Sequence, residues 1–190
     1  YRFQHIYNQR IVRDKKYFFK ILLGLPINFS DSKSIINKVI KIVKKITLKN
    51  YVIMVKPHPA LKISKIKNEF KNNWPKNFQL VNMSSALAIQ DADLMISRSS
   101  SICLESLACG VPVLIINKKN TFDNSSIPIE IDQNLWRDCK VEDDIIRGIK
   151  TFYERRSTDL SYNLKIGKKI RSTYFKPHSK EESKSFLEIK

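Results

Sequence analysis

The sequence predicts an α/β protein with a Rossmann-like open parallel sheet of five or six strands, covered by helices on both faces. Short apolar runs of strand length alternate along the chain with longer segments in which apolar residues recur at helical spacing. Within the short runs, apolar residues do not alternate with polar ones, which is typical of parallel strands buried on both sides. The 190 residues are enough for one domain with a hydrophobic core.

The first half of the chain predicts three strands and three helices in alternation. Each strand is a run of large apolar residues that ends at a proline or a polar turn. The expected strands cover 20–27, 51–55 and 78–82, and the expected helices cover 35–46, 61–70 and 84–90. Asn28 to Ser32 supply the turn and the N-cap before the first of these helices.

The second half is organised around the stretch from Asp91 to Asn117. Its expected elements are a strand at 94–96, a serine-rich turn at 97–101, a helix at 102–109, a glycine stop at Gly110 and a strand at 111–116. Beyond it we expect a loop over 118–134, a sixth strand over 135–139 and helices over 141–156, 160–175 and 179–189. Acidic residues at the start of the helix at 141–156 and arginines at its end suit the helix dipole.

Three segments make up the expected domain organisation. Residues 1–19 mix basic and aromatic residues without a clear pattern, so we expect a linker from an N-terminal domain that this chain lacks. Residues 20–156 are the Rossmann-like domain, and residues 157–190 are helices that pack on it or back on the missing half. Because the chain starts at Tyr1 and not at Met, we expect a fragment of a longer protein.

The net charge of +17 indicates attraction to acidic partners such as phosphorylated substrates or anionic lipid. The basic residues are spread along the chain, and no zinc-knuckle, RNP-type or KH-type motif accompanies them, so we expect no specific nucleic-acid binding. No apolar run reaches the ~20 residues that a membrane-spanning helix needs. We therefore expect a cytoplasmic protein with, at most, peripheral contact with the inner face of the cell membrane.

Cofactor and metal motifs are absent from the sequence. The three cysteines lack C-x-x-C spacing, which favours a reducing compartment and gives no reason to expect a metal site. The four glycines form neither a G-x-G-x-x-G motif nor a P-loop. We expect no cofactor and no metal, and the usual dinucleotide and triphosphate loops are excluded.

The serine-rich turn is the first candidate for a binding site. Ser99, Ser100 and Ser101 stand at the expected start of a helix, where hydroxyls, unpaired backbone N–H groups and the helix dipole attract an anion such as phosphate. Glu105 lies one turn further along the same helix face. Serines are also ordinary N-caps, and a glutamate near a helix start also complements the dipole, so both interpretations stay open at this point.

Three loops are expected to converge, because the carboxyl ends of parallel strands lie at one edge of the sheet and ligands bind there. His58 follows the second strand, Asn82 to Ser85 follow the third, and Arg98 to Ser101 follow the fourth. An imidazole, a guanidinium, several hydroxyls and a helix N-terminus suit a phosphate or a diphosphate. They would stabilise the charge on a departing phosphate if a sugar–phosphate bond broke there. Glu105 could then accept hydrogen bonds from a ribose.

These motifs in this order resemble the carboxyl-terminal, donor-binding half of GT-B glycosyltransferases. The similar features are His58-Pro59 after one strand, the serines after another, then Glu105 and the run from Gly110 to Val113. The resemblance covers roughly residues 20–190, and the closing segment YFKPHSKEESKSFL is also similar. Within that fold, the sequence most resembles bacterial surface-carbohydrate and capsule transferases of the polysialyltransferase-like and Kdo-transferase-like types, which use CMP-sugars.

The resemblance implies a role for each motif. His58 would contact or protonate the leaving phosphate. The donor phosphate would be bound by Pro59, Arg98, Ser99, Ser100, Ser101 and Glu105, with Glu105 meeting the ribose, and the base would be bound by Asn82, Ser84 and Ser85. The carbohydrate acceptor and the catalytic base would belong to the N-terminal domain, so this chain alone would bind the donor but transfer poorly. Arg98 has no counterpart in the family's pattern.

Three alternatives stay open. A UDP-sugar 2-epimerase-like protein shares the architecture and the His-Pro pair, but it has a glycine-rich turn where Ser99 to Ser101 stand here. A CDP-glycerol glycerophosphotransferase-like domain uses similar His and Ser motifs. A non-catalytic basic module that binds anionic lipid or polymer would rest on the net charge alone, and its binding would collapse with salt.

Overall fold

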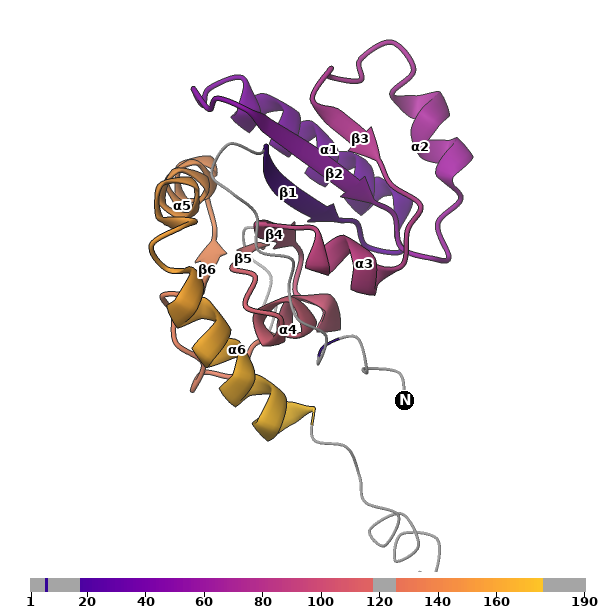
Figure 1. The fold of residues 1–190 in the computed structure, drawn as a ribbon. Helices are drawn as coiled ribbons and strands as arrows, with labels where there is room; N and C mark the ends of the chain where they lie inside the picture. The colour runs from indigo at the N-terminus through magenta and orange to yellow at the C-terminus, as the bar shows by residue number, and fades with distance from the viewer. Residues whose placement is uncertain (1–5, 7–17, 118–125, 176–190) are drawn as a thin grey trace, which may run out of the picture.

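The computed structural model describes residue 6, residues 18–117 and residues 126–175. Strands and helices alternate as far as the fifth strand, as the sequence predicts, and a sixth strand and two helices follow (Figure 1). The strands are β1 (Phe19–Gly24), β2 (Tyr51–Lys56), β3 (Phe78–Leu80), β4 (Leu94–Ser97), β5 (Val113–Ile116) and β6 (Trp136–Cys139). The helices are α1 (Phe29–Val43), α2 (Ile63–Glu69), α3 (Ser85–Gln90), α4 (Ser101–Ala108), α5 (Glu142–Arg155) and α6 (Leu160–Tyr174).

The six strands form one parallel sheet in the order β3-β2-β1-β4-β5-β6. The chain builds outward from β1 to β3 and then crosses back to place β4 on the other side of β1. The loops after β1 and β4 therefore leave the sheet in opposite directions and open a crevice between them, which is where ligands bind in folds of this kind. The predicted fold class is confirmed.

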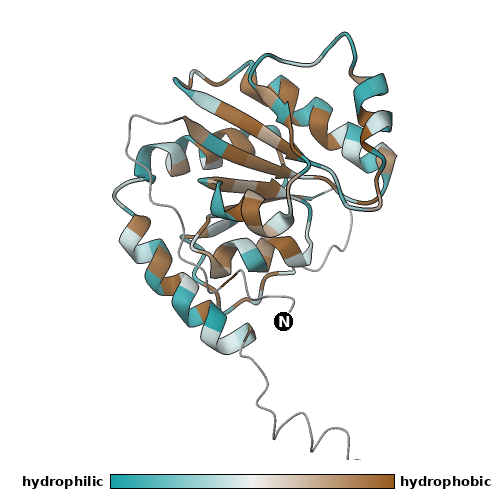
Figure 2. Ribbon diagram, turned by 45° about the vertical axis from the view of Figure 1, so that its right-hand side comes forward, coloured by the Kyte–Doolittle hydropathy of each residue, from teal (hydrophilic) through white to brown (hydrophobic). Residues whose placement is uncertain are grey.

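Helices cover both faces of the sheet because successive side chains of each strand point to opposite sides. Ile21 and Leu23 of β1 belong to one fully buried cluster, which α1, α2 and α5 complete. Leu22, between them, belongs to a second cluster on the other face, with α3, α4 and α6. Figure 2 shows the apolar strands enclosed between helices whose outer faces are more polar.

Glycines allow α4 and α6 to pack closely. Gly110 follows α4 with a φ of +73°, a left-handed conformation that glycine adopts without strain. A Cβ atom on Gly167 of α6 would lie 2.9 Å from the carbonyl oxygen of Ala108 and 2.9 Å from the backbone nitrogen of Gly110. Arg171 of α6 donates a hydrogen bond of 2.7 Å from its guanidinium to the Ala108 carbonyl. The C-terminal end of α4 is therefore fixed against α6, while its N-terminal end faces the crevice.

The element boundaries differ from the sequence predictions at several points. Residue 19, which we assigned to the linker, begins β1, because the backbone of Phe19 pairs with β2. The first strand ends at Gly24 and not at residue 27, so Leu25 and Pro26 are free to line the crevice. The fifth strand begins at Val113, since Pro112 has no N–H to donate to the sheet.

Parts of three predictions lie outside the described residues. They are most of the linker at 1–19, residues 118–125 of the loop at 118–134, and the helix at 179–189. Ile6, within the predicted linker, is fully buried in the second core cluster. None of the described helices is both long and apolar enough to cross a membrane.

All three thiols are expected to be unreactive in the folded protein. Cys103, Cys109 and Cys139 are free and buried. Burial is the main cause that raises the pKa of Cys103 to about 11 and of Cys139 to about 12, so almost no thiolate exists near neutral pH. An aromatic disulfide reagent at pH 8 should release little chromophore until a denaturant is added, after which three thiols should react. Rapid labelling of Cys103 without denaturant would contradict this burial.

Candidate functional site

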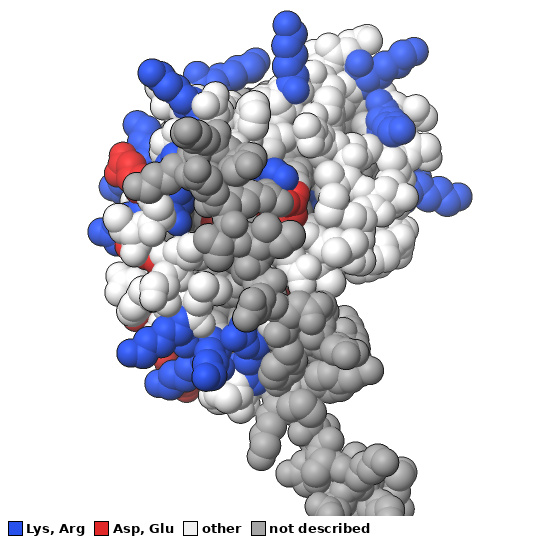
Figure 3. Space-filling model, viewed as in Figure 1, with Lys and Arg blue, Asp and Glu red and all other residues white. Residues whose placement is uncertain are grey.

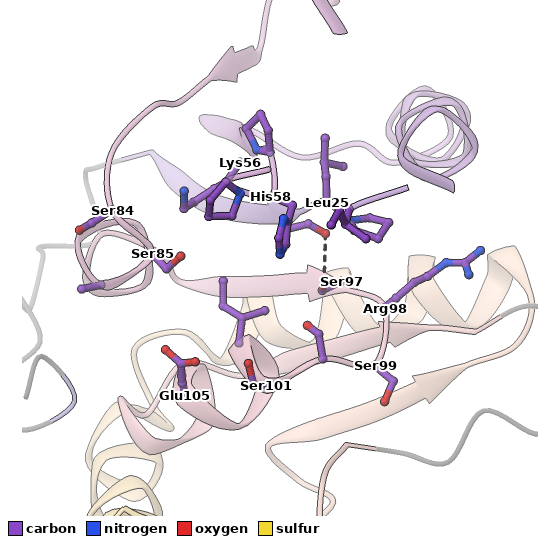
Figure 4. Close-up of a pocket in the computed structure, with 18 residues that line it drawn as sticks. Leu25, Lys56, His58, Ser84, Ser85, Ser97, Arg98, Ser99, Ser101 and Glu105 are labelled. Atoms are coloured by element: carbon purple, nitrogen blue, oxygen red, sulfur yellow. Dashed lines mark hydrogen bonds between the residues drawn. The ribbon is translucent and has the colours of Figure 1, made fainter. Parts of the chain in front are cut away.

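The crevice at the carboxyl edge of the sheet contains a cavity of about 590 Å³. Four segments line it: Gly24–Ile27 after β1, Lys56–Pro59 after β2, Ser84–Ala86 at the start of α3, and Ser97–Ile102 with Glu105 from the β4–α4 region. Figure 4 shows Lys56 and His58 on one side of this cavity, with Ser101 and Glu105 on the opposite side. The structure therefore brings together loops that lie as far apart in the sequence as Gly24 and Glu105.

His58 is held between two prolines in the loop after β2 and is exposed to the cavity. The backbone N–H of Ala60 donates a hydrogen bond of 3.2 Å to Nδ1 of its ring. Because Nδ1 accepts this bond, the neutral ring carries its proton on Nε2, which is then the donor available to a ligand. His58 is thus suited to donate a hydrogen bond to a phosphate oxygen.

The turn between β4 and α4 is fixed by hydrogen bonds that its serines donate or accept. Ser97, buried at the end of β4, donates from Oγ to the carbonyl oxygen of Gly24 at 3.0 Å and so joins the two strands that flank the crevice. Ser99 Oγ accepts a hydrogen bond of 2.7 Å from the backbone of Ser126, and Ser126 Oγ donates to the carbonyl of Ser100 at 3.1 Å. In Figure 4 the Ser99 hydroxyl points away from His58.

The N-terminus of α4 faces the cavity without a capping side chain. Ser100 is the N-cap residue, yet its side chain makes no capping hydrogen bond. Figure 4 shows the Ser101 hydroxyl pointing into the cavity, so this hydroxyl and the N-terminal N–H groups of the helix face the same space. A helix N-terminus with hydroxyls around it suits an anionic group. The open cap therefore favours the phosphate interpretation over the plain capping one.

Arg98 lines the cavity, but its guanidinium does not reach the imidazole. Figure 4 shows it extending away from His58 and Glu105. Its Nη1 lies 3.4 Å from Oδ2 of Asp31 on α1, while its Nε is buried without a hydrogen-bond partner among the described residues. The side chain ties the serine turn to α1, and a direct contact between Arg98 and a phosphate stays a prediction.

Glu105 lies one turn from Ser101 and is only 7% exposed. Figure 4 shows its carboxylate at the edge of the cavity, on the same side as the Ser101 hydroxyl. A carboxylate in this position can accept hydrogen bonds from sugar hydroxyls. No group of three His, Cys, Asp or Glu side chains that could hold a metal ion occurs in the described part of the chain.

The residues predicted to bind the base are only partly at the cavity. Ser84 and Ser85 line it, and Ser84 also caps α3 by accepting a hydrogen bond of 3.3 Å from the backbone of Leu87. Asn82 does not line the cavity. It comes directly after the edge strand β3, and the chain reaches the cavity only further along this loop, at Ser84 and Ser85. Its role in binding a base stays a prediction.

Lys56 is a charged lining residue that sequence reasoning missed. It is the last residue of β2 and is only 9% exposed. Burial lowers its pKa, and no acidic neighbour offsets that effect. The signal in the sequence was a lysine that directly continues a wholly apolar strand into the Pro-His-Pro turn.

The geometry defines a Rossmann-like domain with a ligand crevice, and comparison with solved structures identifies its fold as one half of the GT-B architecture. A putative UDP-N-acetylglucosamine 2-epimerase from Listeria monocytogenes superposes with a TM-score of 0.57 at 13% identity, covering 81% of this chain and 40% of that one. The Neisseria meningitidis UDP-GlcNAc 2-epimerase bound to UDP-GlcNAc gives 0.55 at 16% identity, covering 80% and 39%.

A third similar structure is itself a single domain. The C-terminal domain of a group 1 glycosyl transferase (LpcC) from Francisella tularensis superposes with a TM-score of 0.53 at 16% identity, covering 87% of this chain and 91% of that domain. This chain spans about two fifths of the two epimerase chains. No protein-family model and no curated protein sequence matches it. These structural similarities establish the fold alone, and the reaction depends on the residues of the site.

Proposed function

We propose that this chain binds the nucleotide-sugar donor of a glycosyltransferase and stabilises the phosphate that leaves during transfer. The observation that carries the proposal is the convergence of His58, the open N-terminus of α4 and Glu105 on one cavity at the point where the strand order reverses. His58 and the helix N-terminus supply donors for phosphate oxygens, and Glu105 supplies an acceptor for the ribose. Ser84 and Ser85 would lie beside the base.

We further propose that the donor is a CMP-sugar and that it is used in bacterial surface polysaccharide or capsule synthesis. Its support is the order of the His-Pro and serine motifs in the sequence. A carbohydrate acceptor would be bound by a second domain facing the crevice, so the isolated chain would bind the donor and transfer little. No cofactor or metal would take part at the nucleotide. The protein would act in the cytoplasm, in peripheral contact with the inner face of the membrane.

The fold also suits a UDP-sugar 2-epimerase, since two of the similar structures carry that description. The serine turn favours the transferase, because its side chains occupy the place where a glycine-rich turn would bring the backbone close to a diphosphate. A CDP-glycerol glycerophosphotransferase would need the same phosphate and cytidine contacts. A preference for uridine or cytidine nucleotides therefore distinguishes the epimerase from the CMP-sugar transferase and the CDP-glycerol glycerophosphotransferase.

A basic module that binds anionic polymers has less support. Figure 3 shows lysine and arginine side chains in several separate groups around one face of the molecule. Such scattered charges give weak, salt-sensitive binding, whereas the cavity offers directed donors and acceptors. The charge assists the approach of phosphorylated ligands and does not define a binding site of its own.

Calorimetric titration of the purified chain with CMP, CDP, UMP and UDP at moderate salt tests the proposal. We expect binding that favours a cytidine nucleotide and persists when the salt concentration is raised. A preference for UDP would replace the CMP-sugar reading with the epimerase-like one. Absence of any nucleotide binding, together with salt-sensitive capture by anionic vesicles, would overturn the donor-site proposal in favour of the basic module.

A further inference from the structure

Lys56 is placed at the cavity by the strand ladder. Its backbone pairs with Gly24 of β1, and its carbonyl oxygen accepts a hydrogen bond of 2.9 Å from the N–H of Leu25. Side chains of a strand alternate between the two faces, so Lys56 points to the same face as Met54, which packs in the cluster of α3, α4 and α6. The lysine is therefore directed toward the α3 and α4 side of the crevice, where the helix N-terminus lies.

Lys56 and Arg98 both line the cavity, and among the described residues only Arg98 has an acidic partner. No hydrogen bond or ion pair joins the ammonium group of Lys56 to another residue of the described chain, although the residue as a whole is only 9% exposed. Lys56 lines the cavity, so its ammonium group borders a partly enclosed space, where a cation without a counterion carries a partial desolvation cost. Burial lowers the pKa of Lys56, which is the direction expected for a partly desolvated cation. An anion entering the cavity would supply the missing partner.

We propose that Lys56, and not Arg98, is the cationic side chain that contacts the phosphate of the bound nucleotide. This inference rests on the proposed function, because it needs a nucleotide in the cavity. His58 is two residues further along the same loop, and Ser101 faces both from across the cavity. A phosphate between them would have Lys56 and His58 on one side and the N-terminus of α4 on the other. Arg98 keeps the serine turn in position through Asp31.

The test compares a nucleotide with its nucleoside on the Lys56→Met variant. Methionine keeps the length and the apolar stem of lysine but removes the charge, so the fold should be retained, which thermal unfolding followed by circular dichroism verifies. The ligands are the nucleotide that binds wild type best and the matching nucleoside, which lacks only the phosphate. We expect the variant to bind the nucleotide about 10- to 100-fold more weakly and the nucleoside unchanged, as for loss of one charged hydrogen bond.

The control variant is Lys62→Met, which removes an exposed lysine just beyond the same loop and outside the cavity lining. It should bind both ligands as wild type does, which separates a local contact from the general effect of charge. If wild type binds the nucleotide and Lys56→Met keeps the same ratio of nucleotide to nucleoside affinity, Lys56 is not the phosphate contact and the proposed function stands. If wild type binds no nucleotide, the proposed function fails and this inference fails with it.

Because the nucleotide lacks the sugar that a full donor would transfer, this comparison assigns the contact to the phosphate and not to an acidic group of the transferred sugar. An equal loss of nucleotide and nucleoside affinity in a folded Lys56→Met variant would show that the lysine shapes the cavity without meeting the phosphate, which would overturn the inference. An Arg98→Lys variant should retain most of the nucleotide affinity. A larger loss from Arg98→Lys than from Lys56→Met would assign the phosphate to the arginine.

Discussion

Replacing His58 with alanine is expected to weaken nucleotide binding by about 10- to 100-fold, since it removes one hydrogen bond to a charged phosphate. The hydrogen bond from the Ala60 backbone to Nδ1 orients the ring and leaves the Nε2 proton for the ligand. His58 is exposed, so the variant should unfold at nearly the wild-type temperature. Calorimetric titration of both proteins with the preferred nucleotide measures the loss.

A His58→Gln variant is the matched control, because glutamine keeps an N–H donor on a side chain of similar reach. It should recover part of the affinity that alanine loses, while the nucleoside should bind all three proteins alike. Equal nucleotide affinity in wild type and His58→Ala would remove His58 from the site. Recovery by glutamine would also show that the histidine acts as a neutral hydrogen-bond donor, with no need for a positive charge.

Replacing Gly167 with valine is expected to lower the free energy of unfolding by about 3 kcal/mol, the scale at which overpacking disturbs a close-packed core. A Cβ atom at this position meets backbone atoms of α4, including the Leu107 carbonyl at 3.1 Å, and these atoms cannot rotate away. The two helices would have to move apart, which loses buried contacts across the second core cluster. Urea-induced unfolding of the variant and wild type measures the difference.

Lys168→Val on the same helix is the control for this substitution. Lys168 is exposed, so valine there introduces only the lower helix propensity of a β-branched residue, roughly 0.5 kcal/mol. Similar losses in the two variants would show that the spacing of α4 and α6 does not depend on the glycine. A selective loss in Gly167→Val would also predict weaker nucleotide binding, because α4 carries Ser101 and Glu105 to the cavity.

Most elements could be predicted from the sequence because each is encoded locally. The wholly apolar run at residues 94–96 predicts a buried parallel strand, and the structure adds only Ser97 to it. The recurrence of apolar residues from Ile35 to Ile46 predicts an amphipathic helix, which the structure begins earlier, at Phe29, with Asn28 as its cap. The observed strand boundaries differ from the predicted ones where hydrogen bonds to other strands, and not the local sequence pattern, decide where a strand begins or ends.

The sequence predicted the loops of the candidate site but only part of the set of side chains that line the cavity. His58, Ser101 and Glu105 face a common cavity, as expected from the rule that parallel strands end at one edge. Asn82 does not line it, whereas Ser84 and Ser85, further along the same loop after the edge strand β3, do. Nothing in the chain near residue 82 specifies which part of this loop turns toward the cavity. The strand order follows from which apolar faces pack together across the whole domain.

By itself the sequence determined the α/β class, the alternation of strands and helices, and the loops that carry chemistry, since these depend on residue periods and turns within short windows. Only the tertiary structure decided which side chains enter the cavity. Arg98 turns toward Asp31, 67 residues away in the chain, and Lys56 is left without an acidic partner among the described residues. The direction of a side chain and the cost of burying its charge depend on neighbours that the fold supplies, so the roles of these two cations become visible only once the chain is folded.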